Sequence, residues 1–234
     1  MLTHALFPTL IGEWYYERHY HFKDIFFRNV LNHIGPNGEW GETSGHIDIH
    51  QDPDFVNFFT MTSFFAKEYV SQLKVDTDLW DFNLVKSWLT ISDKWSVPHH
   101  NHEDAHLSFV YYMNIPDKAP SAPIHFVNMH KPNDLTGNMF HTQGDNSAMV
   151  KQWNVFNSLS WNWTPNEGLL LIFPANLRHY TQTGYPGAID SRVNTVEALK
   201  NRRISLAGDF LLTFKENKAI SYGLQPVSNW KVFA

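Results

Sequence analysis

Residues 98–115 read PHHNHEDAHLSFVYYMNI and join a histidine-rich segment to an apolar one. The histidine-rich part holds four histidines in eight residues: His99, His100, His102 and His106. The apolar part, Leu107–Ile115, is dominated by aromatic and aliphatic side chains, as in a buried strand. Histidine is the commonest metal-binding side chain. The stretch therefore predicts a metal-binding loop that leads directly into a strand of a β-rich fold.

Two pairs of side chains in this loop could hold a metal. Residues two apart in an extended segment point the same way, so His100 and His102 can converge on one ion, and so can His102 and Asp104. Two histidines and a carboxylate on one face of an octahedral site are typical of non-haem iron(II) oxygenases. Both pairs stay open at this point, although we favour His100 with His102.

A further ligand is expected from a distant part of the chain. His179 follows the apolar segment Gly168–Phe173 and a short turn, which places it at the end of a predicted strand. A strand end is a rigid position from which a ligand can be presented. We therefore predict His179 as the third ligand.

A candidate site for an acidic ligand lies downstream. Arg203 and Ser205 are two residues apart at the start of the predicted strand Ile204–Phe214, so their side chains should share one face. A guanidinium matches a carboxylate bidentately, and a hydroxyl adds another hydrogen bond. Arg202 should point the other way, towards solvent.

The rest of the chain divides into a helical front and a β-rich back. Apolar residues recur at helical spacing from Phe22 to Ile34 and again from Phe55 to Leu73, where Asp52 and Pro53 suit a helix start. Between these helices, Ser44–Ile49 alternates like a strand. The other predicted strands are Leu84–Ile91, Leu107–Ile115, Ile124–Val127, Gly168–Phe173 and Ile204–Phe214. Residues 131–162 read as a long insertion.

This organisation predicts one domain over residues 1–234, with a helical front over 1–79 and a jelly-roll core over 80–234. Short strands without helical crossovers favour an antiparallel sandwich or jelly roll. The fold class is therefore mainly β with flanking helices.

Composition excludes several classes of protein. There is no cysteine among the 234 residues, which rules out disulfides, zinc–thiolate sites and thiol nucleophiles. The net charge of −5 and the scattered basic residues argue against general nucleic-acid binding. No segment has the length of apolar sequence that a membrane span needs, and no signal peptide is recognised, so we expect a cytoplasmic protein. Its substrate, small or macromolecular, is not indicated.

The two histidine-bearing blocks resemble a known family. His100-Asn101-His102 followed by Leu107–Pro116 is similar to the 2-oxoglutarate/iron(II) oxygenases of the prolyl-hydroxylase-like superfamily that are common in phage and marine bacterial genomes. The likeness extends to Leu6–Ile11, to Trp88, to 168–179 and to 203–205. This sequence departs from the family in carrying Phe109 where glycine is usual. It also has a longer gap between His179 and Arg203, in which 184–200 reads as an inserted loop.

The resemblance implies a double-stranded β-helix, iron(II) held by His100, His102 and His179, and 2-oxoglutarate bound by Arg203 and Ser205. The implied activity is a 2-oxoglutarate-dependent dioxygenase that hydroxylates a substrate and releases succinate and carbon dioxide. One alternative is a cupin-type metalloenzyme without 2-oxoglutarate, in which His106 could be a ligand. Another is a catalytically silent jelly-roll binding protein. Zinc hydrolysis also suits histidine ligands, but no His-Glu-x-x-His sequence supplies a base.

Overall fold

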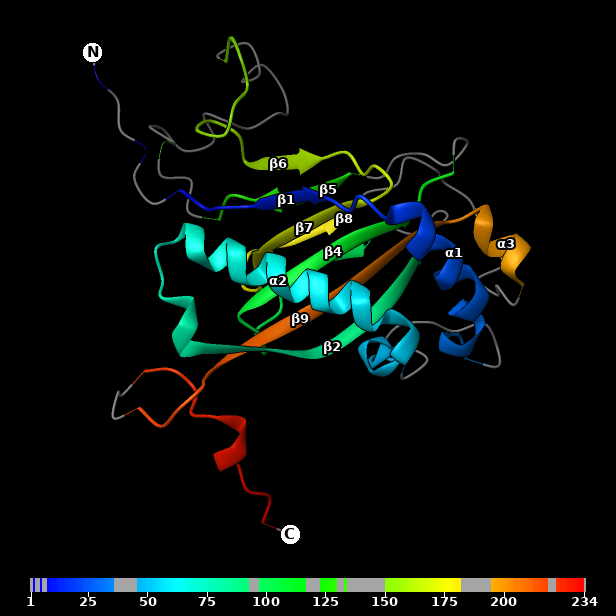
Figure 1. Cartoon of the computed structure of the whole chain (residues 1–234). Helices are drawn as coiled ribbons and strands as arrows, with labels where there is room; N and C mark the ends of the chain where they lie inside the picture. Colours follow the sequence, from blue (N-terminus) through cyan, green and yellow to red (C-terminus); the bar gives the residue numbers. More distant parts are fainter. Residues whose placement is uncertain are drawn as a thin grey trace.

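Two antiparallel sheets form the body of the protein in the computed structural model (Figure 1). The structure describes residues 2, 5, 8–35, 46–92, 97–116, 123–129, 133, 150–181, 195–218 and 222–233. The major sheet has the strand order β1-β7-β4-β9-β2. Its strands are β1 (Gly12–Tyr15), β7 (Leu169–Pro174), β4 (Leu107–Asn114), β9 (Arg203–Phe214) and β2 (Trp80–Ser92).

The minor sheet has the order β3-β8-β5-β6. Its strands are β3 (Val97–His100), β8 (His179–Thr181), β5 (Ile124–Val127) and β6 (Ser160–Trp163). From β2 to β9 the chain passes repeatedly from one sheet to the other, which is the winding of a double-stranded β-helix. The predicted fold class is therefore confirmed.

Helices cover the outer face of the major sheet. They are α1 (His19–Asn29), α2 (Val56–Gln72) and α3 (Val196–Lys200), with 3-10 turns at Val30–His33, Ile49–Gln51, Pro53–Phe55, Thr77–Leu79 and Val227–Asn229. Figure 1 shows α2 lying across this sheet. Asp52 caps the turn that leads into α2, because its carboxylate accepts a hydrogen bond from the Asp54 amide at 2.9 Å. The predicted helix start is confirmed.

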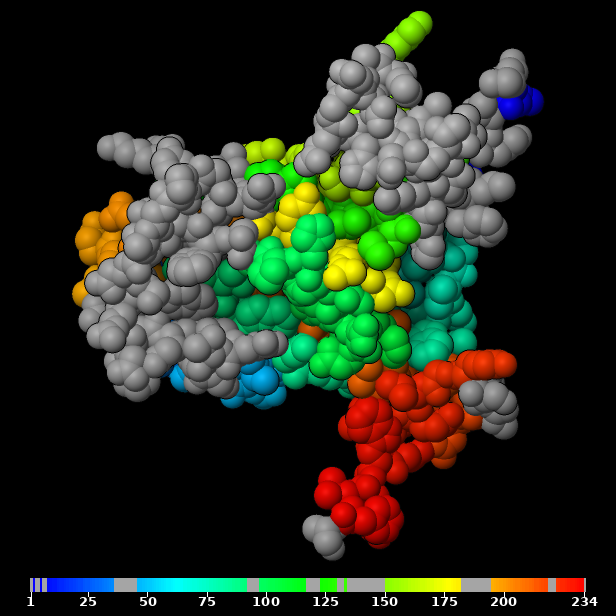
Figure 2. All heavy atoms as spheres, turned by 180° about the vertical axis from the view of Figure 1, so that it is seen from behind, coloured from blue at the N-terminus to red at the C-terminus, as the bar shows by residue number. Residues whose placement is uncertain are grey.

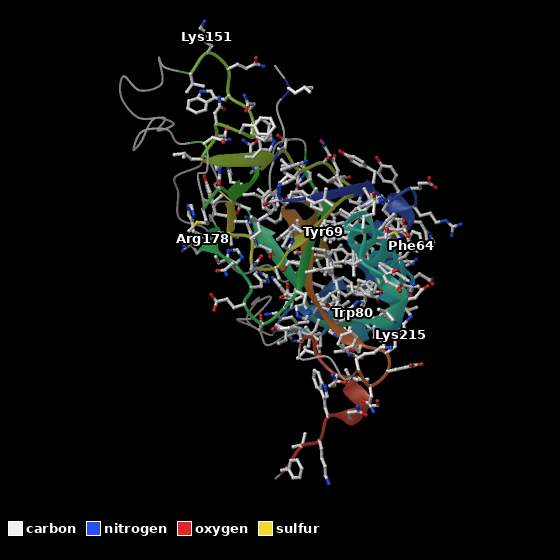
Figure 3. All side chains as sticks on the ribbon, turned by 90° about the vertical axis from the view of Figure 1, so that its left-hand side faces the viewer. Phe64, Tyr69, Trp80, Lys151, Arg178 and Lys215 are labelled. Atoms are coloured by element: carbon white, nitrogen blue, oxygen red, sulfur yellow. The ribbon has the colours of Figure 1, made fainter. Side chains whose placement is uncertain are left out.

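The amphipathic pattern of α2 decides which side faces the sheet. Phe58, Phe59, Ala66, Tyr69 and Val70 are buried and recur at helical spacing. In Figure 3, Tyr69 points towards the sheets, whereas Phe64 lies on the solvent side, 57% exposed. The helices and the outer face of the major sheet enclose the larger core cluster, and the space between the sheets holds a smaller one.

The five strands predicted from Trp80 onward all occur, with small changes at their ends. One predicted strand is wrong. Within Ser44–Ile49, residues 44 and 45 lie outside the described residues, Asp48 forms only an isolated bridge to Ser87, and Ile49 begins a 3-10 turn. Alternation over so few residues did not distinguish a bridge from a strand.

Four short strands escaped prediction, namely β1, β3, β6 and β8. Each has only three or four residues, too few for alternation to be visible. β1 belongs to the predicted helical front but pairs with β7. β6 lies within the predicted insertion 131–162, most of which lies outside the described residues.

Phe109, which stands where the resembling family has glycine, is matched by a glycine on the next strand. Phe109 pairs with Gly208 across β4 and β9, and the Phe109 ring occupies the space where a side chain at 208 would begin. A Cβ atom at 208 would lie 2.6 Å from the Phe109 ring and 2.8 Å from the Lys86 carbonyl oxygen. The ring is 1% exposed, so it has nowhere to move.

We expect Gly208→Ala to lower the free energy of unfolding by about 1–3 kcal/mol, the usual cost of overpacking a tight core. Urea unfolding followed by circular dichroism measures this. In a Phe109→Ala background the same substitution should cost less, because the ring is gone. Equal costs in the two backgrounds would contradict the packing described here.

No helix among the described residues is long and apolar enough to cross a membrane.

Candidate metal and cosubstrate site

Three histidines from two strands and one loop meet between the sheets. One ring nitrogen of each of His100, His102 and His179 lies within 4.8 Å of the others. His100 ends β3 and pairs directly with His179, the first residue of β8. His102 is carried in by the following loop, whose backbone is tied to the end of β7 by a hydrogen bond from the His102 amide to the Ala175 carbonyl, 2.8 Å.

The other ring nitrogen of each histidine is engaged by a hydrogen-bond acceptor. The Nδ1 of His100 lies 2.8 Å from the Pro98 carbonyl oxygen, and the Nδ1 of His179 lies 2.8 Å from the Leu177 carbonyl oxygen. The Nδ1 of His102 lies 2.8 Å from both oxygens of the Asp209 carboxylate. Carbonyl and carboxylate oxygens accept hydrogen bonds, so each Nδ1 carries the proton. Each Nε2 is then left with a lone pair for a metal.

Burial keeps the His179 ring in its ligating form. His179 is 6% exposed and packs against the rings of Phe173 and Phe126. Desolvation lowers the pKa of His179 to about 4, against a weaker opposing effect of its hydrogen bond to Leu177. The imidazole is therefore neutral at pH 7, which is the state that binds a metal.

Asp209 lies behind His102 on the inner face of the major sheet. It pairs with Ser108 on β4 and with Lys86 on β2, so the three side chains form one row across the sheet. The Ser108 hydroxyl donates to Asp209 Oδ1 at 2.6 Å, and Lys86 Nζ lies 3.2 Å from Asp209 Oδ2. The Asp209 side chain is 0% exposed.

Asp104 is placed away from the cluster. Its carboxylate forms an ion pair with Lys86 at 3.0 Å, and its side chain is 70% exposed. Burial acts to lower the pKa of Lys86, but Asp104 and Asp209 together raise it above the ordinary value. Of the two ligand pairs left open by the sequence, only His100 with His102 joins His179 in the described part of the chain.

The two remaining histidines of the loop have other contacts. His106 accepts a hydrogen bond from the Leu212 amide at its Nδ1, 2.9 Å, so this ring is tied to β9. His99 points to the outer face of the minor sheet and stacks on Tyr180, with ring centroids 4.0 Å apart. Figure 2 shows this face of the molecule, opposite α2, and Figure 3 shows neighbouring Arg178 on the same side, far from Phe64. His106 therefore does not take the ligand position that a cupin-like site would give it.

Arg203 and Ser205 share the inner face of β9, as predicted. Both are 3% exposed. Ser205 pairs with Tyr112 on β4 and with Thr90 on β2, so these three form a second row on the same face as Asp209. The guanidinium carbon of Arg203 lies 5.2 Å from the centroid of the Tyr112 ring. Arg202 precedes the strand and is partly buried rather than fully solvated.

The second row offers polar groups in a desolvated setting. Burial lowers the pKa of Arg203 and raises that of Tyr112 to about 12, so at pH 7 Tyr112 is a neutral phenol. The Tyr112 hydroxyl interacts electrostatically with Arg203, but no described residue meets it at hydrogen-bonding geometry. A buried hydroxyl without such a partner is suited to a hydrogen bond with a polar ligand.

A pocket of about 500 Å³ lies at the edges of β2 and β3. It is lined by His100 and His102 on one side and by Trp88 and Thr90 on the other. The Trp88 ring lies 5.5 Å from that of His102. Two of the clustered histidines and Thr90, the β2 partner of Ser205, thus line the same pocket.

Sequence reasoning missed the polar residues that support the site: Lys86, Thr90, Ser108, Tyr112 and Asp209. A signal existed for Asp209. It is the single carboxylate in the strand 203–214, and it has the same parity as Arg203 and Ser205, which places all three on one face.

Part of the sequence matches a known family model. Residues 86–194 match the family model described as "Putative 2OG-Fe(II) oxygenase". The matched segment contains all three clustered histidines. This part of the chain is therefore similar to the 2OG-Fe(II) oxygenase family. No curated protein matches the sequence.

Solved structures of low sequence identity are also similar to this chain. A 2OG-Fe(II) oxygenase family oxidoreductase from Burkholderia pseudomallei has 14% identity and a TM-score of 0.36, over 70% of this chain and 54% of the other. A prolyl-4-hydroxylase from Pseudomonas putida has 13% identity and a TM-score of 0.49, over 86% and 92%. The epimerase SnoN from nogalamycin biosynthesis has 10% identity and a TM-score of 0.49, over 91% and 81%. This chain thus spans about half the length of the first of these structures.

Proposed function

We propose that this chain is an iron(II)- and 2-oxoglutarate-dependent dioxygenase that hydroxylates its substrate. The observation that carries the proposal is the histidine cluster, in which one ring nitrogen of each histidine lies close to the other two. The Nδ1 atom of each ring lies beside a hydrogen-bond acceptor, which leaves Nε2 for the metal. Three neutral imidazoles on one side of an ion leave the opposite coordination positions open. That arrangement suits a metal that must bind a cosubstrate and dioxygen.

The residues of the chain divide into two groups with separate tasks. His100, His102 and His179 would hold iron(II). Arg203 and Ser205, on the inner face of β9, would bind the far carboxylate of 2-oxoglutarate, with the Tyr112 hydroxyl as a further donor. A charge-assisted contact with a buried guanidinium is strong and directional, so it fixes the orientation of the cosubstrate.

Iron(II) held by the three histidines would supply the chemistry in which decarboxylation of 2-oxoglutarate by dioxygen is coupled to hydroxylation of the substrate, with succinate and carbon dioxide as co-products. The protein supplies orientation and a shielded cavity. Trp88 and the cores on either side limit the access of water to the histidines. The pocket edge between β2 and β3 leaves an approach for the substrate.

Anaerobic titration tests the proposal. Purified metal-free protein should bind one equivalent of iron(II), and addition of 2-oxoglutarate should then produce the weak visible charge-transfer band of the chelate. A cupin-type enzyme would bind iron without the band, and a silent binding protein would bind neither. Either result would overturn the proposed function.

The identity of the third ligand can be tested by a pair of substitutions. His100→Ala should abolish iron binding, because a ligand lost from the metal costs more than the 10–100-fold typical of a supporting residue. Asp104→Ala should retain it, because that carboxylate contacts Lys86 and not the cluster. The iron occupancy of each variant after anaerobic reconstitution decides between the two assignments. His102→Ala is the positive control, because His102 is a ligand in both. The opposite ranking would assign the site to His102 and Asp104.

A further inference from the structure

Among the residues that the structure describes, no carboxylate joins the three-histidine cluster, although one is usual in non-haem iron sites. Without it, the histidines would contribute no negative charge, and a bound ion would keep its full charge until a cosubstrate binds. The buried carboxylate next to the cluster in the described part of the chain is Asp209, whose oxygens are both 2.8 Å from His102 Nδ1. It therefore lies one imidazole ring away from the metal position.

We propose that Asp209 is a positioning residue that replaces this missing charge, acting on iron through His102. The inference rests on the proposed function, because it assumes that the histidines bind iron. Asp209 accepts the Nδ1 proton of His102, which fixes the orientation of the ring and makes Nε2 a stronger donor.

The surroundings of Asp209 hold its carboxylate in one orientation. Ser108 donates to Oδ1 at 2.6 Å and Lys86 lies 3.2 Å from Oδ2, while the side chain is fully buried. Because Ser108, Asp209 and Lys86 lie opposite one another on three paired strands, the register of the major sheet sets this contact. A carboxylate is retained in a buried position only with such partners.

The hydrogen-bond acceptor of the His102 Nδ1 atom differs from those of the other two histidines. His100 and His179 donate to the neutral carbonyls of Pro98 and Leu177, each two residues away in the sequence. Those contacts orient the rings but bring no charge. Asp209 is 107 residues from His102 in the sequence, so its presence there is not a by-product of local chain geometry.

Asp209→Asn separates charge from shape, because the amide oxygen still accepts from His102 while the negative charge is lost. We expect iron(II) affinity to fall by about 10–100-fold, as for other supporting residues behind a metal ligand. We also expect the reduction potential of the bound iron to rise, since the ferric state loses more stabilisation than the ferrous state. Anaerobic titration and redox potentiometry measure the two effects.

Asp104→Asn is the matched control. Asp104 contacts the same Lys86 amine at a similar distance but touches no ligand histidine. It should leave both iron affinity and potential at wild-type values. If Asp209→Asn leaves both unchanged while wild-type protein binds iron, the inference is wrong and the proposed function stands. If wild-type protein binds no iron, the proposed function itself fails.

A measurement on the unaltered protein covers the case in which Asp209→Asn does not fold. In zinc-loaded wild-type protein, nitrogen-15 NMR should show a protonated Nδ1 for His102, with its proton further downfield than those of His100 and His179, because a carboxylate is a stronger acceptor than a carbonyl. A His102 signal in line with the other two would overturn the inference.

Discussion

Replacing His179 with alanine should abolish iron binding while leaving the fold intact. His179 is one of the three clustered histidines proposed as ligands, and loss of one of three ligands should remove most of the metal affinity. Its position at the start of a three-residue strand, with its backbone paired to β3 and β5, means that the substitution changes the side chain and not the sheet. The measurements are iron stoichiometry after anaerobic reconstitution and the circular dichroism spectrum.

His99→Ala is the control for this experiment. His99 belongs to the same histidine-rich stretch, but it lies on the outer face of the minor sheet, stacked on Tyr180. It should bind iron like the wild-type protein. Iron at wild-type stoichiometry in His179→Ala would remove this residue from the site. Loss of iron in both variants would point to a general effect of losing histidines.

The second large effect is expected at Arg203. Removing one partner of a buried charge-assisted pair costs about 2–5 kcal/mol. Arg203→Ala should therefore raise the 2-oxoglutarate concentration needed for half-saturation by roughly one to three orders of magnitude. Iron affinity should hardly change, because Arg203 lies in the Ser205 region of β9 and not behind a ligand histidine. The charge-transfer band, titrated with 2-oxoglutarate, measures the shift.

Arg202→Ala separates this effect from a general loss of positive charge. Arg202 is the preceding residue, lies before β9 begins, and is more exposed than Arg203. It should change the 2-oxoglutarate requirement little. If the two variants behave alike, or in reverse order, Arg203 does not bind the cosubstrate as proposed.

The sequence predicted the longer strands and the clustering of the three histidines because both depend on local pattern. Apolar runs such as Leu169–Phe173 define buried strands, and the two-residue spacing of His100 and His102 places both side chains on one side. The short strands β3 and β8 were not predicted, although they bring His100 opposite His179. Strands of three or four residues form because their neighbours in the sheet are in place.

The supporting residues of the site depend on register, which a single sequence does not reveal. Asp209 meets His102 only because β9 pairs with β4 and β2 in one alignment. A shift of one residue would place Asp209 on the helix-covered face. The position of Asp104 outside the histidine cluster also depends on a neighbouring strand. Its carboxylate forms an ion pair with Lys86 on β2 instead of joining the histidines.

The Nδ1 contacts of the three histidines have a consequence for which metal the protein acquires. The ligand rings are held before any ion arrives, and an all-imidazole set suits zinc, copper, nickel and iron alike. Divalent affinity for such a set rises from iron to nickel and copper. Such a ligand set does not favour iron, so the ions that are supplied decide which metal the site holds. We expect protein prepared without added iron to carry a competing ion, and metal analysis to find iron only where iron was offered first.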